Sequence, residues 1–454
     1  MDDLSRSGAA VPAPSPLTSY NAYHIVGIGG IGISAIARML SMEGKKVTGS
    51  DRSRSSVTDE LEVAGISISF EQNAAALPTD AECVIHTIAM PVDAPELATA
   101  RERGLRVMTY PEALGEISRD KFTIAISGTH GKTTTTAMIA KVLMDAGLDP
   151  TVIVGSVLID AKSNFIAGKS SILVVEACEY RRSFLNLNPD VVVITNVEAD
   201  HLDYYKDLED VRSAFVSFVE KIPAEGFVVA NMCQEGMADV VGTTLADVRD
   251  YSEYECDVDL KAPGRHNYEN AKAALAVADL LHVDPAAALK SVSEFAGTWR
   301  RFESRGSFAV EGQGVSAALV YDDYAHHPTE VRATLAGAKE RFQGVKKVVV
   351  FQPHTYTRTK ALLADFGEAF KDADRVIVLP IYAAREPHDE TISSSMVADK
   401  ITASGVLAEA VESHEVAVER VRAIVAELAR YGEGCVVFTM GAGDVRDIGD
   451  SLLS

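Results

Sequence analysis

Three things are scarce in this sequence: paired cysteines, an excess of positive charge, and long apolar runs. The five cysteines occur singly, without C-x-x-C spacing, which argues against a disulfide framework or a zinc site and favours a reducing compartment, the cytoplasm. Asp and Glu number 65 against 43 Lys and Arg, a formal net charge of −22. We therefore expect no nucleic-acid partner, because phosphate backbones attract basic surfaces. No apolar run reaches membrane-spanning length, so we expect no membrane insertion.

Apolar runs of strand length alternate with segments of helical periodicity along nearly the whole chain. This alternation is typical of parallel sheets covered by helices, so the expected fold class is α/β. The chain of 454 residues is long enough for several domains, and we predict three. They are a Rossmann-like N-terminal domain at 21–119, a central P-loop-type ATPase domain with a mostly parallel sheet at 120–298, and a C-terminal Rossmann-like α/β domain at 299–454. Residues 1–20, rich in Ser, Pro and Ala without the apolar core of a signal peptide, are predicted to form a disordered tail.

The strongest functional motif is Ser-Gly-Thr-His-Gly-Lys-Thr-Thr-Thr from residue 127, between the apolar run 122–126 and an amphipathic stretch. A glycine-rich turn between a strand and a helix aims backbone N–H groups at phosphate oxygens, Lys132 adds a positive charge, and the Thr133 hydroxyl can bind Mg²⁺. The motif departs from G-x-x-x-x-G-K-[ST], which needs a glycine where this chain has Ile126. A chance Gly-Lys-Thr is the competing interpretation, but apolar residues at i, i+3, i+4 and i+7 after the loop predict the helix that a phosphate loop requires. The predicted ligand is ATP, and the predicted binding residues are Gly128, Thr129, His130, Gly131, Lys132, Thr133 and Thr134.

A second glycine motif, G-x-G-x-x-G, is formed by Gly27, Gly29 and Gly32 directly after an apolar run. Asp51 follows nineteen positions after Gly32, where a dinucleotide-binding fold places the carboxylate that binds a ribose. Taken alone, the motif indicates NAD, yet its physics requires only a diphosphate at a helix N-terminus, which a UDP-sugar also supplies. A tight turn that serves helix packing is the third interpretation.

Two further apolar runs, 171–176 and 189–196, carry polar groups at their ends. Glu176 ends the first run and His201 follows the second, and the ends of parallel strands meet at the sheet edge where ligands bind. Glu176 is a candidate Mg²⁺ ligand beside phosphates, because hard cations prefer oxygen, although a cap or a salt bridge would also explain it. His201 is a candidate neighbour of the same ion, and a hydrogen-bonded loop histidine is the alternative.

Several motifs occur in order along the chain. They are Ser-Gly-Thr-His-Gly-Lys-Thr-Thr from residue 127, Glu-Ala-Cys-Glu-Tyr from 176, Thr-Asn-Val-Glu-Ala-Asp-His-Leu-Asp from 195, and Gly-Arg-His-Asn-Tyr-Glu-Asn-Ala from 264. Together they resemble the Mur ligases, the ATP-dependent amide-forming enzymes of peptidoglycan synthesis. Within that family, Tyr-Asp-Asp-Tyr-Ala-His-His-Pro-Thr-Glu from 321 and Phe-Gln-Pro-His-Thr-Tyr-Thr-Arg-Thr from 351 are similar to the members that add the first amino acid. The resemblance spans residues 23–444.

The resemblance implies a three-domain ligase that joins L-alanine to the lactyl carboxylate of UDP-N-acetylmuramate. The carboxylate would attack the γ-phosphate of ATP to give an acyl phosphate and ADP, and the amine of alanine would then displace phosphate. Because an acyl phosphate hydrolyses readily, the domains would have to close around the ligands. The implied cofactors are ATP and Mg²⁺, the latter as two ions that offset the repulsion between anionic groups. The implied partners are therefore the small molecules ATP, UDP-N-acetylmuramate and L-alanine.

The resemblance also implies roles for residues at matching positions. The implied catalytic residues are Lys132, Glu176, His201 and His326, and the implied Mg²⁺ ligands are Thr133, Glu176 and His201. Further ATP contacts fall to Asn267 and Asn270 at adenine, Arg301 at the phosphates and Asp322 at the ribose. The UDP-sugar would be bound by Gly27, Gly29, Gly30, Gly32, Asp51 and His130, and the amino acid by Tyr324, His326 and Arg358. Asparagine near a helix start is also a common cap, and for Asn270 both interpretations remain open.

Two positions depart from the family pattern. Some relatives carry an additional arginine three residues before Arg358, where this chain has Thr355, so a second donor for the amino-acid carboxylate is lacking there. Other Mur ligases use a carbamylated lysine on the helix after the Asp-His motif, but residues 208–220 contain no lysine, and we predict no carbamate. The adjacent His326 and His327 could suggest zinc, yet the sequence offers no nearby ligand cluster.

Two alternatives compete with this function. A ligase that recycles a whole tripeptide onto the same sugar nucleotide would share the motifs of the first two domains and differ in the third. An NAD-binding oxidoreductase would rest on the first glycine motif and Asp51 alone, and would leave Lys132, Glu176 and His201 without a purpose. The sequence leaves open the oligomeric state and the preference for alanine over glycine or serine.

Overall fold

The computed structural model describes most of the chain. The described residues are 16–159, 161, 163–261, 263–309, 317–384 and 386–454. Residues 1–15 of the predicted tail lie outside this part. Its remaining end is ordered, because Leu17–Ser19 forms a 3-10 helix (η1), Leu17 is 3% exposed, and its N–H donates to the Glu116 carboxylate at 2.9 Å. The prediction of a disordered tail therefore does not hold for residues 16–20.

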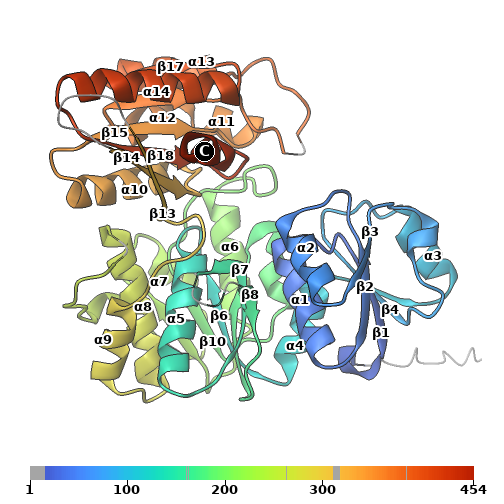
Figure 1. Cartoon of the computed structure of the whole chain (residues 1–454). Coiled ribbons are helices and arrows are strands. Elements are labelled where there is room, and N and C mark those ends of the chain that lie inside the picture. The colour runs from blue at the N-terminus through green and yellow to red at the C-terminus, as the bar shows by residue number, and fades with distance from the viewer. Residues whose placement is uncertain (1–15, 160, 162, 262, 310–316, 385) are drawn as a thin grey trace, which may run out of the picture. The chain divides into compact units, whose positions relative to one another are not determined.

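The N-terminal part is built on a five-stranded sheet in which every pairing is parallel (Figure 1). Its order is β3-β2-β1-β4-β5, the arrangement of a Rossmann-like sheet. The strands are β1 Ala22–Val26, β2 Lys46–Ser50, β3 Ser67–Ser69, β4 Cys83–His86 and β5 Arg106–Thr109. The helices are α1 Ile31–Met42, α2 Ser56–Val63, α3 Pro95–Glu102, α4 Tyr110–Arg119 and the short 3-10 helix η2 Ala74–Ala76.

The central part contains a seven-stranded sheet in the order β12-β11-β10-β6-β9-β7-β8. All pairings are parallel except β7 with β8. The strands are β6 Phe122–Ser127, β7 Thr151–Leu158, β8 Ser163–Ile166, β9 Ile172–Glu176, β10 Val191–Ile194, β11 Phe227–Ala230 and β12 Asp247–Asp250. The helices are α5 Lys132–Asp145, η3 Tyr180–Asn186, α6 Leu208–Val219, α7 Met237–Val241, η4 Tyr251–Glu253, α8 Arg265–Leu280 and α9 Pro285–Ser293.

The C-terminal part contains a six-stranded sheet in the order β13-β14-β18-β15-β16-β17, with only the β13–β14 pair antiparallel. The strands are β13 Glu303–Ala309, β14 Ala317–Asp323, β15 Lys346–Phe351, β16 Arg375–Val378, β17 Leu407–Ala410 and β18 Cys435–Met440. The helices are α10 Pro328–Arg341, α11 Tyr356–Ala361, α12 Leu363–Ala369, α13 Ser394–Ala403, α14 His414–Arg430 and α15 Arg446–Leu453. Apolar runs at 315–321, 345–351, 375–379 and 435–440 predict four of these strands, β14, β15, β16 and β18; residues 315 and 316 lie outside the described part. The edge strands β13 and β17 carry exposed polar residues and gave no such signal.

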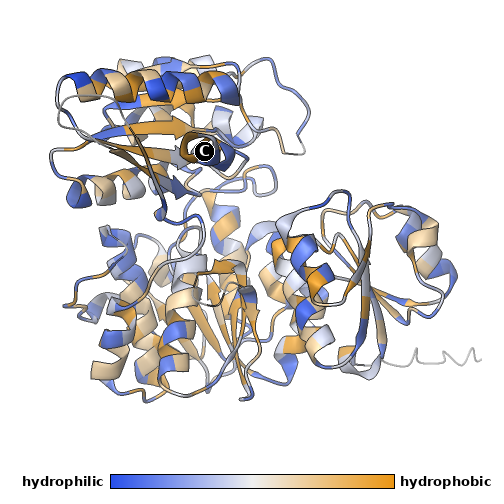
Figure 2. Ribbon diagram, viewed as in Figure 1, coloured by the Kyte–Doolittle hydropathy of each residue, from blue (hydrophilic) through white to orange (hydrophobic). Residues whose placement is uncertain are grey.

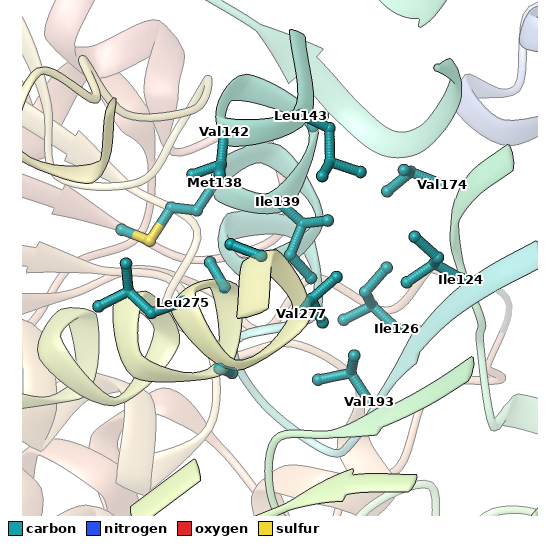
Figure 3. Close-up of a cluster of buried hydrophobic side chains, with 14 of the residues drawn as sticks. Ile124, Ile126, Met138, Ile139, Val142, Leu143, Val174, Val193, Leu275 and Val277 are labelled. Atoms are coloured by element: carbon teal, nitrogen blue, oxygen red, sulfur yellow. The ribbon is translucent and has the colours of Figure 1, made fainter. Parts of the chain in front are cut away.

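Helices cover both faces of these sheets, which explains why the strands are apolar almost throughout (Figure 2). In the central part, Ile139 and Leu143 of α5 are fully buried against Ile124 and Ile126 of β6, and Val277 of α8 closes the same cluster (Figure 3). Packing of this kind fixes the start of α5 relative to the carboxyl ends of β6, β9 and β10.

The chain divides into two compact units, residues up to Lys121 and residues from Phe122 onward. The first unit holds one sheet and the second holds two, so the architecture is α/β with three domains. Among the described helices, none combines the length and the apolar character needed to cross a membrane.

Candidate active site

The phosphate loop connects β6 to α5 and requires glycine at two positions. Gly128 has φ +132°, and a Cβ atom there would lie 2.0 Å from the Thr195 hydroxyl oxygen. Gly131 has φ +81°, and its Cβ would lie 2.6 Å from the Asn270 amide oxygen. Both positions lack room for a side chain and have a backbone that side-chain-bearing residues rarely adopt. The turn therefore requires its two glycines because Thr195 and Asn270 leave no room for a side chain there.

Asn196, the second residue after β10, holds the middle of this loop. It accepts the Thr129 N–H on its carbonyl oxygen at 3.0 Å and the His130 N–H on its side-chain oxygen at 2.9 Å, and its amide donates to the His130 carbonyl at 3.0 Å. These two loop N–H groups are thus used within the protein. The N–H groups at the start of α5, from Gly131 onward, have no partner within the helix and form the anion-binding end.

Lys132 is held by a buried carboxylate that the sequence reasoning did not select. Its ammonium lies 2.9 Å from Glu179, which is 2% exposed, and also donates to the carbonyls of Gly128 and Thr129. Burial opposes the charge of Lys132, but the carboxylate of Glu179 raises its pKa overall. Glu179 Oε1, which also accepts from Lys132 at 3.0 Å, lies 3.5 Å from His201 Nε2. The signal was present in the sequence, because Glu179 belongs to the Glu-Ala-Cys-Glu-Tyr motif.

The predicted metal ligands Thr133 and Glu176 meet directly. The Thr133 hydroxyl donates to the Glu176 carboxylate at 3.0 Å, and the same oxygen accepts the Gly155 N–H at 2.8 Å. This hydroxyl and carboxylate are the kind of oxygen ligands that Mg²⁺ prefers, and they meet at the N-terminal end of α5, the helix end that attracts anions. His201, the third predicted ligand, is connected to them through the Glu179–Lys132 pair.

His130 lies between two carboxylates of the second unit. Its Nε2 is 3.5 Å from Glu198 and its Nδ1 is 3.4 Å from Glu330, and its ring lies 4.7 Å from that of His327. Burial alone would lower the pKa of His130, but the two carboxylates raise it to about 9. The imidazole is therefore a cation at neutral pH.

A cluster of potential metal ligands does lie beside His327, contrary to the expectation from sequence. His130, Glu198 and His327 present ligand atoms within 4.8 Å of one another. The protonated His130 has no lone pair to offer, however, and His327 Nδ1 accepts the Thr329 N–H at 3.3 Å, which places the proton of His327 on Nε2. The chemistry of the cluster favours an ion-pair network over a metal site.

A cavity of about 330 Å³ opens beside the phosphate loop. The predicted ATP residues that line it are His130, Gly131, Thr133, Thr134, Asn267, Asn270 and Arg301. Asn270 is not a cap, because α8 begins at Arg265 with Gly264 as its N-cap, and the Asn270 amide bonds to Thr135 and Asn267 instead.

The structure does not bring Asp322 to this cavity. Asp322 is fully buried and accepts from Arg300 at 2.8 Å and from Thr439 at 2.6 Å. Asp323 lines the cavity instead, because successive side chains of a strand point to opposite faces. Burial raises the pKa of Asp323 to about 6, despite the nearby Arg301.

A second cavity of about 350 Å³ contains Asp200, His201, His354, Thr355 and Arg358. Arg358, the predicted ligand of the amino-acid carboxylate, is paired with Asp200 through Nη2 at 2.9 Å and Nε at 3.1 Å. Burial would raise the pKa of Asp200, but Arg358 and its neighbours hold that pKa far below the ordinary value. A ligand carboxylate must therefore share or replace this partner.

His326 and Tyr324 lie between the two cavities. His326 packs against the His354 ring at 5.7 Å on one side and contacts Glu330 through Nδ1 at 3.2 Å on the other. Burial lowers the pKa of His326 to about 3, so its ring is neutral. The Tyr324 ring is 5.2 Å from the guanidinium of Arg301, which reaches Glu330 at 3.5 Å.

The glycine motif of the first unit forms the turn between β1 and α1. Gly29 N–H donates to the Asp51 carboxylate at 2.8 Å, and a Cβ on Gly29 would lie 2.9 Å from the same oxygen. Gly27 has φ +77°, Gly30 is the N-cap of α1, and Gly32 packs against the Tyr110 ring. Helix packing thus explains the glycines in part, and the α1 N-terminus remains a suitable anion site. His130 belongs to the other unit.

Three family models match the chain in succession. They are described as Mur ligase family, catalytic domain, at residues 22–122; Mur ligase middle domain, at 126–253; and Mur ligase, glutamate ligase domain, at 300–443.

Similar proteins cover almost the full length. The UDP-N-acetylmuramate–L-alanine ligase of Clostridium perfringens is 38% identical, covering 95% of this chain and 97% of its own. That of Caldicellulosiruptor saccharolyticus is 40% identical, covering 94% and 96%. The crystal structure of a UDP-N-acetylmuramate–alanine ligase from Thermotoga maritima superimposes with a TM-score of 0.75 at 29% identity, covering 95% and 98%. A murein peptide ligase from Psychrobacter arcticus, at 23% identity and a TM-score of 0.69, shares the fold.

Proposed function

The chain belongs to the Mur ligase family, and on this premise we propose that it joins L-alanine to UDP-N-acetylmuramate at the expense of ATP. The relatives that match it over nearly their whole length carry that activity in their names. The product would be an amide on the lactyl carboxylate, formed through an acyl phosphate with release of ADP and phosphate. Because ATP and nucleotide sugars are metabolites of the cytoplasm, we expect the reaction to take place there.

One observation carries the proposal: Lys132 stands at the start of α5, beside the Thr133–Glu176 pair at 3.0 Å. A cation, a row of helix N–H groups and two oxygen ligands converge where a transferred phosphoryl group would be stabilised. Lys132 would exchange part of its contact with Glu179 for phosphate oxygens. This set serves phosphoryl transfer and has no use in an oxidoreductase.

ATP would occupy the cavity beside the phosphate loop. Asn267 and Asn270 would read adenine, Arg301 would contact the phosphates, and the position beside the ribose passes from Asp322 to Asp323. Asp323 lines the cavity and is only 5% exposed. Asp322 and Asp323 are adjacent in the sequence, so the proposed ribose contact still comes from the same Asp-Asp motif.

Thr133, Glu176 and His201 would hold Mg²⁺, and the family precedent suggests two ions. The pairing of a hydroxyl with a carboxylate at the phosphate-binding end of α5 fits a hard cation. Bound Mg²⁺ would offset the charge of the phosphates and of the reacting carboxylate. Glu179 would orient His201 from behind through its contact at 3.5 Å.

The amino acid would bind in the cavity around Arg358. Its carboxylate would meet the Arg358 guanidinium, a group suited to two-pronged bonds, with Thr355 in the place of a second arginine. Tyr324 and His326 would approach the amine, where the unprotonated ring of His326 has a lone pair to offer. The UDP-sugar would bind at the α1 N-terminus in the first unit. For His130, in the second unit, a role toward the same ligand is what the family resemblance implies.

The test measures ADP release by purified protein with ATP, Mg²⁺ and UDP-N-acetylmuramate, with and without L-alanine, and identifies the product by mass spectrometry. Alanine-dependent ADP release with an alanyl amide as product is the expected result. Turnover with tripeptide and none with alanine would assign the chain to the recycling ligases. Oxidation of NADH without ADP release would instead favour the oxidoreductase.

A further inference from the structure

Glu330, at the third position of α10, contacts residues of both proposed sites and has no role in the scheme above. We propose that Glu330 is a positioning residue that couples the ATP cavity to the amino-acid site and fixes the tautomer of His326. This inference rests on the proposed function, because the two sites it joins are those of ATP and L-alanine.

The two oxygens of the Glu330 carboxylate face different ways. Oε1 lies 3.4 Å from His130 Nδ1 and 3.5 Å from Arg301 Nη1, both of which line the ATP cavity. Oε2 accepts the His326 N–H at 3.0 Å and the His327 N–H at 3.3 Å, and lies 3.2 Å from His326 Nδ1. One side chain therefore holds groups from the phosphate loop, the segment before β13 and the loop before α10.

The charge of Glu330 is matched to these neighbours. Its side chain is only 10% exposed, and burial would raise its pKa, but the cations His130 and Arg301 hold that pKa well below the ordinary value. Glu198, Asp200 and Asp323 are further carboxylates near this network. A buried carboxylate with two cations beside its Oε1 is costly to neutralise, because each cation would lose its partner.

The contact with His326 has a chemical consequence. His326 Nδ1 faces two acceptors, the Tyr324 carbonyl at 3.0 Å and Glu330 Oε2 at 3.2 Å. Nδ1 must therefore carry the proton, which leaves the lone pair on Nε2. The ammonium of alanine has to lose a proton before it attacks an acyl phosphate, and the fixed lone pair on Nε2 offers an acceptor. Burial lowers the pKa of this ring and the Glu330 carboxylate raises it, so Glu330 also makes the acceptor more basic.

The decisive variant is Glu330→Gln. Glutamine can replace glutamate at this position of a capping box, so α10 should still begin normally, while the charge is lost and the amide can donate to His326 Nδ1. Glu340→Gln, an exposed position of the same helix, is the matched control.

Hydroxylamine serves as a second nucleophile. Its nitrogen attacks the acyl carbon, phosphate leaves, and the hydroxamate forms without a protein base, because hydroxylamine is unprotonated at neutral pH.

We expect Glu330→Gln to reduce kcat/KM for L-alanine by about 10²-fold, the usual contribution of general-base catalysis, and to raise the KM for ATP several-fold. The hydroxylamine-supported rate should fall at least tenfold less, and the alanine deficit should shrink as pH rises from 7 to 9 and the free amine accumulates. Glu340→Gln should match the wild type. Equal losses with both nucleophiles, or an unchanged alanine rate, would overturn the inference.

A readout independent of turnover follows the histidine itself. In protein labelled with ¹⁵N-histidine, with the signals assigned through His326→Gln, the wild type should show a protonated Nδ1 and an unprotonated Nε2. Glu330→Gln should shift this tautomer ratio, whereas the same ratio in both proteins would refute the inference. Wild-type protein with this tautomer but no alanine-dependent ADP release would count against the proposed function, while the role of Glu330 in fixing the tautomer would stand.

Discussion

The two glycine turns of this chain are alike in local structure but differ in the residues that surround them. Each follows the first strand of a parallel sheet and precedes a helix. In the first turn, at residues 27–32, the Gly29 N–H is taken by a carboxylate, Asp51, at 2.8 Å. In the second, at residues 128–131, the loop N–H groups are taken by the neutral Asn196, and Lys132 follows. The local glycine pattern gives both turns a backbone suited to binding an anion. The surrounding residues determine whether a turn only binds the anion or also promotes a reaction.

The largest expected effect is the loss of the cation that only the second turn carries. Lys132→Ala should reduce ADP release by about 10²- to 10³-fold, the scale for removing one preorganised charge from a transition state. Lys141→Ala, on the same helix with a partly exposed side chain, is the control and should leave the rate unchanged. A Lys132→Ala rate within a few-fold of wild type would mean that the second turn, like the first, only binds.

The next contrast concerns the glycines themselves. Gly128→Ala combines a positive φ with a clash against Thr195, and should cost about 3 kcal/mol of unfolding free energy. Gly29→Ala clashes only with the side chains of Asp51 and Thr58 and should cost about 1 kcal/mol. Urea unfolding measures both, and Gly147→Ala, with φ +76° and open space, isolates the backbone strain.

A double variant sharpens that comparison. Asp51→Ala should recover part of the loss in Gly29→Ala, since the obstructing oxygen is removed. Thr195→Ala should recover little in Gly128→Ala, because backbone atoms of Asn196 remain 3.0 Å from the added carbon. Full recovery in the second pair would show that the Thr195 side chain alone requires this glycine.

The second turn should also respond to pH in a way that the first cannot, because only it contains a histidine. The pKa of His130 is raised to about 9, so its charge stabilises the fold fully below about pH 6.5 and the contribution is lost as pH rises through 9. The unfolding free energy of wild type relative to His130→Asn should fall by about 3 kcal/mol over this range. His282→Asn, at an exposed position, should show no such trend.

The smallest effect is expected at the first turn. Asp51→Ala removes one hydrogen bond to the turn and should weaken UDP-N-acetylmuramate binding about fivefold, near 1 kcal/mol, with the KM for ATP unchanged. Isothermal titration against the sugar nucleotide measures this change. Equal weakening of ATP would contradict the assignment of the two turns to different ligands.

Periodicity and motifs predicted the α/β class, the strands β14, β15, β16 and β18, and the loop before α5. Buried parallel strands can be predicted in this way because they consist of consecutive apolar residues. The edge strands β13 and β17 were missed, because they bury few apolar side chains. The site was predicted where a motif carries its own chemistry, as at Lys132. It was missed at Glu179 and Glu330, whose importance comes from partners 47 residues away at Lys132 and in another domain at His130.

Local sequence patterns specify most of the turns, buried strands and helices and the residues that could bind a nucleotide, because those properties depend on neighbours a few positions apart. Which charges meet depends on the folded arrangement. It faced Asp323 rather than Asp322 toward the cavity, paired Arg358 with Asp200 across 158 residues, and placed His130 between two carboxylates. Strand alternation and long-range packing make those choices, and electrostatic energy depends on distance in space rather than along the chain.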